Sequence, residues 1–276
     1  MPIVPFECTF RDNKTIEPEI QLLEIRPRGT DETHEPCAWV FVRREEKYTL
    51  DPKSKEVQDA TITVSYHAVE TRIWPKIRMG GTFQAGYSHW CNRISLTGLS
   101  ALGRGGVMVS DGLRSMRLGT YLFNIIVGWA MQWPIAEVNS IGLAENDGHE
   151  DNRTRRNRFY EQFGLEFEYT DPKGMGGHSR PMPASDLHQV TSWKQNIIVH
   201  KVDEHLGKLL IQNARLRSDL AARERAIKQL TTTMNDQEAH PIRTALRVLW
   251  ARNAWWFVLL LVILGLAAKY HWLWGR

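Results

Sequence analysis

The residues with the clearest chemical potential lie in a basic turn from Arg114 to Thr120. A short apolar run, Gly106 to Ser110, precedes the turn and predicts a strand, while the apolar residues from Leu118 to Trp129 recur at helical spacing. The first amides of such a helix have no partners inside the helix, and the helix dipole places partial positive charge there. Arg114 and Arg117 add to that charge. The turn therefore predicts a phosphate-binding site.

A second chemical element follows the first helix. The sequence predicts a strand over Glu137 to Leu143, a polar loop, and a helix that begins at Asp151 or Asn152 and stops at Gly164. A closing strand, Leu165 to Thr170, completes a strand–helix–strand–helix–strand unit.

This unit resembles the GCN5-related N-acetyltransferase (GNAT) superfamily over roughly residues 86–170. The family's signature Gln/Arg-x-x-Gly-x-Gly/Ala corresponds to Arg114-Ser115-Met116-Arg117-Leu118-Gly119-Thr120. Its second signature, a helix with a Tyr shortly before Gly-Phe, corresponds to Phe159-Tyr160-Glu161-Gln162-Phe163-Gly164-Leu165. Arg117 departs from the pattern, because the family usually has its first glycine there. The part before Gly86 departs as well, since it reads as strands where the family has two helices.

The resemblance implies acetyl-CoA as cosubstrate, bound where two parallel strands part, near Val107–Ser110 and Glu137–Leu143, with no metal. The pantetheine arm would pair with the backbone of Val107 and Val109, and Asn152 would contact the arm or act only as a helix cap. The pyrophosphate would lie on the amides of seven residues: Arg114, Ser115, Met116, Arg117, Leu118, Gly119 and Thr120. Tyr160 would be the general acid, or a ring packed beneath the cofactor. Four arginines could reach the 3′-phosphate or form a solvated face: Arg153, Arg155, Arg156 and Arg158.

The general base is not assigned by the sequence. Five residues are candidates: Glu145, Asp147, His67, Glu70 and His89. A water chain is the alternative to all of them.

The N-terminal part reads as four strands, Glu19–Arg26, Cys37–Arg44, Ala60–Thr71 and Tyr87–Leu96. Together with the GNAT-like unit they give an α/β fold, a mixed sheet with flanking helices, over residues 1–183. The three cysteines fit no zinc template, and a net charge of +4 does not by itself indicate nucleic acid.

A long helical pattern runs from Ala184 to Glu238. Apolar residues occupy the a and d positions of five heptads, with polar exceptions at Asn213 and Arg223. A single Asn at an a position favours a parallel two-stranded coiled coil. Leu210 and Ile211 widen the apolar stripe, so a single helix packed on the domain stays open. The interpretation is a dimerisation helix over residues 184–240.

The C-terminus, residues 241–276, combines a basic segment with an apolar run. Ala254 to Leu273 is long enough to cross a bilayer, and tryptophans stand near both ends. Three arginines precede the run, which by the positive-inside rule predicts a single-pass, tail-anchored protein whose N-terminal domain is cytoplasmic. A buried or interfacial helix is the alternative.

Three functions remain open at this stage. The first is a membrane-tethered N-acetyltransferase acting on a primary amine of a protein or small molecule. The second is a non-catalytic GNAT-fold binding module displayed on the membrane. The third is a structural membrane protein whose coil drives assembly.

Overall fold

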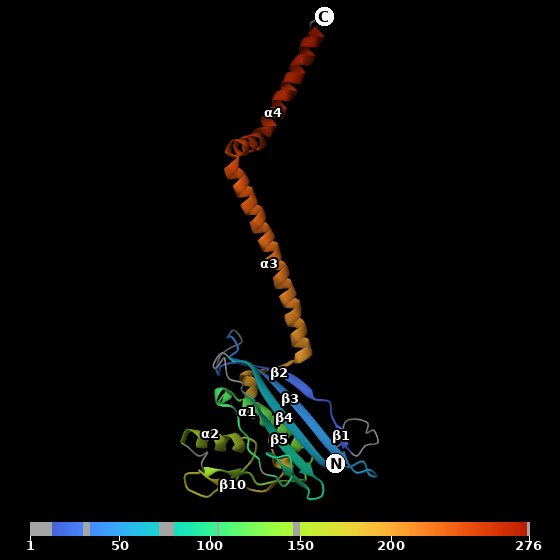
Figure 1. The fold of residues 1–276 in the computed structure, drawn as a ribbon, viewed down its shortest axis with the longest axis vertical. Coiled ribbons are helices and arrows are strands. Elements are labelled where there is room, and N and C mark those ends of the chain that lie inside the picture. The colour runs from blue at the N-terminus through green and yellow to red at the C-terminus, as the bar shows by residue number, and fades with distance from the viewer. Residues whose placement is uncertain (1–12, 30–33, 72–79, 104, 146–149, 275–276) are drawn as a thin grey trace. The chain divides into compact units, whose positions relative to one another are not determined.

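The computed structural model describes residues 13–29, 34–71, 80–103, 105–145 and 150–274. It divides into two compact units, Met1–Leu206 and Gly207–Arg276. The first unit is a mixed α/β structure, as the sequence predicts. Figure 1 shows its strands side by side, with the helices α1 and α2 close to them.

Within the described residues, the large sheet has nine strands in the order β11-β7-β6-β5-β4-β3-β2-β12, with β1 paired to β3. The strands are β1 (Asn13–Thr15), β2 (Glu19–Ile25), β3 (Ala38–Leu50), β4 (Val57–Thr71), β5 (Gly80–Ser88), β6 (Arg93–Ser95), β7 (Glu137–Val138), β11 (Met182–Pro183) and β12 (Ile197–Lys201). β6 and β7 run parallel, whereas the other described pairs in this sheet are antiparallel. A second sheet, in the order β8-β10-β9, contains β8 (Gly142–Leu143), β9 (Phe167–Tyr169) and β10 (Gly177–Ser179).

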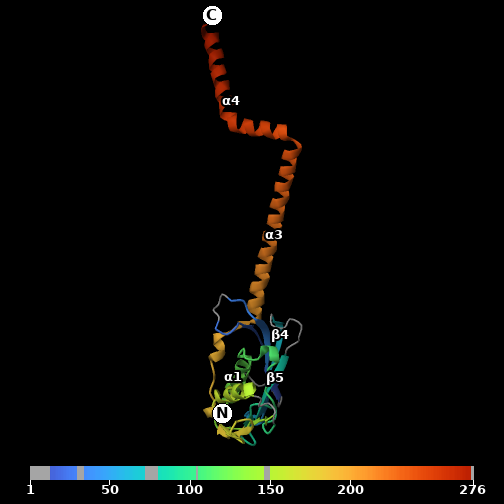
Figure 2. The ribbon, with the colours of Figure 1, turned by 90° about the vertical axis from the view of Figure 1, so that its left-hand side faces the viewer.

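The core lies between the large sheet and α1 (Leu118–Ala130). On β4, Ile62 and Val64 alternate with more exposed residues, so one face of the strand is buried. α1 supplies Leu122 and Ile126, both fully buried, and Figure 2 shows α1 beside β4 and β5 in the turned view. α2 (Glu150–Glu161) packs on α1 through the ring of Phe123, 5.3 Å from that of Phe159.

Three of the strand predictions are wrong in detail. Glu137–Leu143 is not one strand, because the chain leaves β7 after Val138 and forms β8 in the second sheet. Tyr87–Leu96 is not one strand: the chain turns at Asn92, in left-handed conformation, so that β6 pairs back on β5. Gly106–Ser110 is extended but belongs to no strand, because β6 occupies the place beside β7 that this run was expected to take.

The long helix begins later than Ala184. Residues 184–201 form two short 3-10 helices, η3 (Ala184–Asp186) and η4 (Ser192–Gln195), and then β12, which pairs with β2 along its whole length. Val199, which the heptad pattern predicts as the first residue of the coiled-coil seam, therefore lies in a strand. The β-branched run Ile197–Val199 fits both patterns, and pairing with β2 decides between them.

The second unit is helical. α3 (Val202–Ala239) begins in the first unit and continues through the second, and α4 (Pro241–Trp274) follows after His240. None of the described residues of α3 is buried. Within α4, Pro241–Lys269 is the one described stretch long and apolar enough to cross a membrane, judged by length and composition.

Candidate functional site

β7 belongs to the large sheet for only two residues, Glu137 and Val138. Its pairing with β6 ends where the amide of Asn139 donates to the carbonyl of Ile94 over 2.8 Å. The chain then enters the second sheet as β8, where Leu143 faces Gly177 of β10. Two neighbouring parallel strands therefore part after Val138.

The loop from Leu96 to Gly103 is bonded to the chain at the point where β6 and β7 separate. The side-chain amide of Asn139 donates to the carbonyl of Ala101, and Ser95 Oγ donates to the carbonyl of Gly103 over 2.9 Å. The loop between Leu96 and Gly103 is thus fixed to the ends of both strands.

The extended run from Val107 to Ser110 offers an open backbone edge. Within the described part of the chain, the amides of Val107 and Val109 donate no backbone–backbone hydrogen bond, while their side chains pack partly buried against the core. The run is held at its end, where the Ser110 amide donates to the Tyr66 hydroxyl over 3.0 Å. Tyr66 is not among the site residues predicted from the sequence. Its one indication there is an inward-facing position in the alternating buried and exposed residues of β4.

The basic turn has an unusual backbone. After η1 (Asp111–Leu113), Ser115 and Arg117 have φ values of 64° and 61°, and Arg117 is the left-handed N-cap of α1. Left-handed conformations in such turns aim successive amides toward one side, which suits an anion. Glycine adopts a positive φ more easily than other residues, so a glycine would fit at the position of Arg117.

Gly119 lets α1 start close to the extended run. A Cβ added there would lie 3.2 Å from Cγ2 of Val109 and 3.6 Å from Cε2 of Phe159. Leu118 and Thr120 are buried, and Thr120 Oγ1 accepts a hydrogen bond from Gln162 over 3.5 Å. The start of α1, the extended run and α2 are therefore in contact.

Three predicted residues of the turn point their side chains at the protein. Arg114 Nε donates to the carbonyl of Val109 over 3.0 Å, and Arg117 Nη1 donates to that of Ser192 over 2.6 Å. Met116 lies inward, with its carbonyl accepting a 3.1 Å hydrogen bond from Asn196. The side chains of Arg114 and Arg117 are therefore engaged by backbone carbonyls of the protein itself.

Other arginines gather around the turn. Arg155 of α2 donates to Ser115 Oγ over 3.3 Å and to the side-chain oxygen of Asn152 over 2.6 Å. The pKa of Arg28 is lowered by desolvation and then by the positive charges of Arg117 and Arg158. Neighbouring positive charges that lower the pKa of Arg28 indicate a positive potential that an anion would relieve. Arg28 was missed by sequence reasoning because it lies far away in the chain.

The remaining arginines of α2 differ in role. Arg156 donates to the carbonyls of Ala144 and Met175 over 2.7 and 2.6 Å, so it joins two loops of the second sheet. Arg153 lies near the start of α2 and is partly buried.

Tyr160 lies inside an aromatic cluster. The residue is 7% exposed, and its ring centroid lies 5.8 Å from those of Phe123 and Phe167. The ring is therefore held against α1, the helix that starts at the basic turn.

The candidate bases are spread over the domain. Glu145 lies next to Gly176, His89 contacts the hydroxyl of Tyr87 at 3.4 Å, and His67 is exposed on β4, opposite Gly80. Glu70 is in β4, and Asp147 lies outside the described residues. Their positions single out no base.

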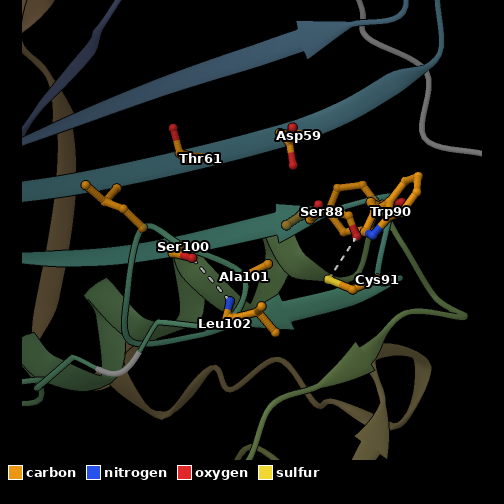
Figure 3. A pocket seen from close by; sticks show the side chains of 10 residues that line it. Asp59, Thr61, Ser88, Trp90, Cys91, Ser100, Ala101 and Leu102 are labelled. Atoms are coloured by element: carbon orange, nitrogen blue, oxygen red, sulfur yellow. Dashed lines mark hydrogen bonds between the residues drawn. The ribbon is translucent and has the colours of Figure 1, made fainter.

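A separate pocket of about 300 Å³ lies at the end of β4 and β5. It is lined by Asp59, Thr61, Tyr87, Ser88, Trp90, Cys91, Leu99, Ser100, Ala101 and Leu102. Figure 3 shows Asp59 and Thr61 on one side of it and Ala101 and Leu102 on the other. Trp90 is 94% exposed beside it, and none of the predicted site residues lines it.

Neither the family models, nor the curated proteins, nor the solved structures with which the chain was compared match it. Within the described residues, no three His, Cys, Asp or Glu side chains are grouped as metal ligands.

Proposed function

We propose that the first unit binds acetyl-CoA and transfers the acetyl group to a primary amine. One arrangement carries this proposal: β6 and β7 separate after Val138, the amides of Val107 and Val109 are open, and α1 begins at a left-handed turn. A long, flexible thioester with a diphosphate at one end needs an open backbone edge along its arm and an anion-binding turn for its phosphates. The open amides would pair with its amide groups, and the turn would bind its phosphates.

The arginines support an anionic ligand. Arg155 contacts Ser115 of the turn, Arg28 lies within electrostatic range of Arg117 and Arg158, and Arg28, Arg155 and Arg158 are all exposed. A phosphate placed there would replace repulsion between guanidinium groups with charge-assisted hydrogen bonds.

The reaction is a direct attack. The amine nitrogen forms a bond to the thioester carbonyl carbon, the C–S bond breaks, and the leaving thiolate takes a proton from Tyr160. The amine loses its extra proton to a base or to water. Most of the acceleration comes from holding the two reactants in line, and proton donation contributes further.

The proposed location is a membrane surface. α4 would cross the bilayer, with Arg243, Arg247 and Arg252 ahead of its apolar part on the cytoplasmic side. The catalytic unit would then act on amines near the inner leaflet.

Isothermal titration of the full chain in detergent with acetyl-CoA tests the proposal. Arg158→Glu is expected to weaken binding by roughly tenfold or more, because it places a negative charge beside the phosphates. Arg215→Glu is the matched control, since Arg215 is an exposed arginine on α3, outside the first unit. Absence of measurable binding, or equal weakening by both variants, would contradict the proposal.

A non-catalytic binding module is the second candidate. The burial of Tyr160 among aromatic rings favours it, because a packed ring can support a bound ligand without donating a proton. Binding of CoA without turnover over a broad panel of amines would favour this alternative.

A further inference from the structure

We propose that α3 pairs with α3 of a second copy as a parallel coiled coil, and that Asn213 and Arg223 set its register. This inference does not depend on the acetyltransferase proposal, but its parallel orientation rests on the proposed membrane anchor. From Val202 to Met234 the seam residues follow one another at alternating intervals of three and four, the spacing that keeps one face of two helices together.

The seam is apolar and exposed in the single chain. Leu206, Leu209, Leu216, Leu220, Ile227, Leu230 and Met234 are between 48% and 65% exposed. Fully burying a side chain of this kind contributes roughly 1.5–3 kcal/mol. A 38-residue helix with no buried residue gains little from its own contacts, so a second helix would supply most of its stability.

The polar residue at the d position fits a second copy by charge. In a parallel pair, Arg223 enters a hole formed by Leu220, Arg223, Glu224 and Ile227 of the other helix. Its guanidinium would therefore meet Glu224 of the second copy. Asp219, four residues earlier on the same helix, lies on its other side.

The same layer of residues also offsets a charge repulsion between the g and e positions of the two helices. In the parallel register, Asp219 at a g position faces Glu224 at an e position of the second copy, and two carboxylates there would repel each other. Arg223 of each helix lies between them and offsets the repulsion. The three residues thus form one consistent layer, and Asn213 forms another by pairing with its own copy.

The anchor selects the parallel orientation. Asn213 could also face Arg223 in an antiparallel pair. α3 spans about 57 Å, and α4 follows it after one residue. With both copies of α4 in one membrane, the C-terminal ends of both α3 helices start from the same side, which an antiparallel pair does not allow.

Disulfide cross-linking of the full chain in membranes tests the proposal. Asn213→Cys and Leu216→Cys place thiols on the seam, and Ile211→Cys is the matched control because it lies at an f position on the outer side. We expect the seam variants to form roughly tenfold more covalent dimer than the control and the native chain. Equal yields, or a monomer, would overturn the proposal. So would an efficient mixed disulfide between separately expressed Asn213→Cys and Arg223→Cys chains, which indicates an antiparallel pair.

The charge layer has its own test in the Leu216→Cys background. Arg223→Glu is expected to lower the cross-linking yield several-fold, because the introduced carboxylate then meets Asp219 and Glu224 without a cation between them. Arg223→Glu combined with Glu224→Arg is expected to recover most of the yield, because the charge pair across the seam is then reversed. Recovery would not occur if Glu224 only stabilises its own helix, and the proposed register would then be wrong.

Discussion

His200 Nε2 in β12 lies 2.9 Å from a carboxylate oxygen of Glu24 in β2. The contact joins β12, the last strand before α3, to β2, which lies near the N-terminal end of the sequence. Arg26 Nε donates to the other carboxylate oxygen over 2.7 Å, and the ring of Trp39 lies tilted beside that of His200, with ring centroids 5.7 Å apart. A charged group that is only 7% exposed is thereby fully partnered.

This contact predicts a loss of stability in acid. Desolvation raises the pKa of Glu24, but the hydrogen bonds from His200 and Arg26 outweigh it, so the folded pKa lies below the usual 4.5. The stability from Glu24 is therefore present above about pH 4.5 and is lost as the pH falls through the folded pKa. Glu24→Gln should destabilise the protein by about 1–3 kcal/mol at pH 7 and should flatten this pH dependence in denaturant unfolding. An unchanged slope below pH 4.5 would show that other carboxylates dominate.

Ser115→Gly is expected to stabilise the fold. Ser115 has a φ of 64°, and a left-handed conformation costs a side-chain-bearing residue roughly 1–2 kcal/mol. Loss of the 3.3 Å contact with Arg155 offsets part of the gain, so a net increase of about 0.5–1 kcal/mol in the free energy of unfolding is expected. Thr154→Gly, in the exposed part of α2, should change stability in the opposite direction. A fall in stability for both variants would argue against the left-handed turn.

Tyr160→Phe separates catalysis from packing. The ring contacts with Phe123 and Phe167 remain, whereas the hydroxyl is lost. If Tyr160 is the general acid, acetyl transfer should fall by about 10²–10⁴-fold with unchanged acetyl-CoA affinity. Tyr169→Phe is the control, because its hydroxyl contacts Glu161 on the exposed side of α2. Turnover equal to that of the native chain would remove Tyr160 from the mechanism.

Ile197→Ala tests the position of β12. Ile197 is 3% exposed and pairs with Ile25 of β2, so the cavity should cost about 2–5 kcal/mol in the free energy of unfolding. Val199→Ala, on the same strand but 37% exposed, should cost much less. Similar effects of the two variants would favour a helix over this segment.

Leu260→Arg tests the anchor. An arginine at the centre of a spanning helix costs roughly 2.5–3.5 kcal/mol on insertion, so the variant should shift from the membrane fraction to the soluble one. Leu246→Arg, ahead of the apolar core of α4, should stay in the membrane fraction. Retention of both variants would point to a helix that lies at the interface.

The local patterns were readable from the sequence. The alternation in β2, β3 and β4, the helical spacing of α1 and the continuous apolar run of α4 each depend on residues close in the chain. The sequence therefore predicts these elements, their type and the basic turn from Arg114 to Thr120.

Tertiary contacts decided the rest, because they join residues that no local pattern relates. Pairing with Ile25 turned Ile197 and its neighbours into a strand, and the hairpin at Asn92 placed β6, instead of Val107–Ser110, beside β7. Arg28 and Arg155 are 89 and 40 residues away in sequence from Arg117 and Ser115 of the turn, and they approach it only when β2 and α2 are packed around α1. Backbone hydrogen bonds and burial are satisfied by the whole fold at once, so they override a pattern that fits two local structures equally well.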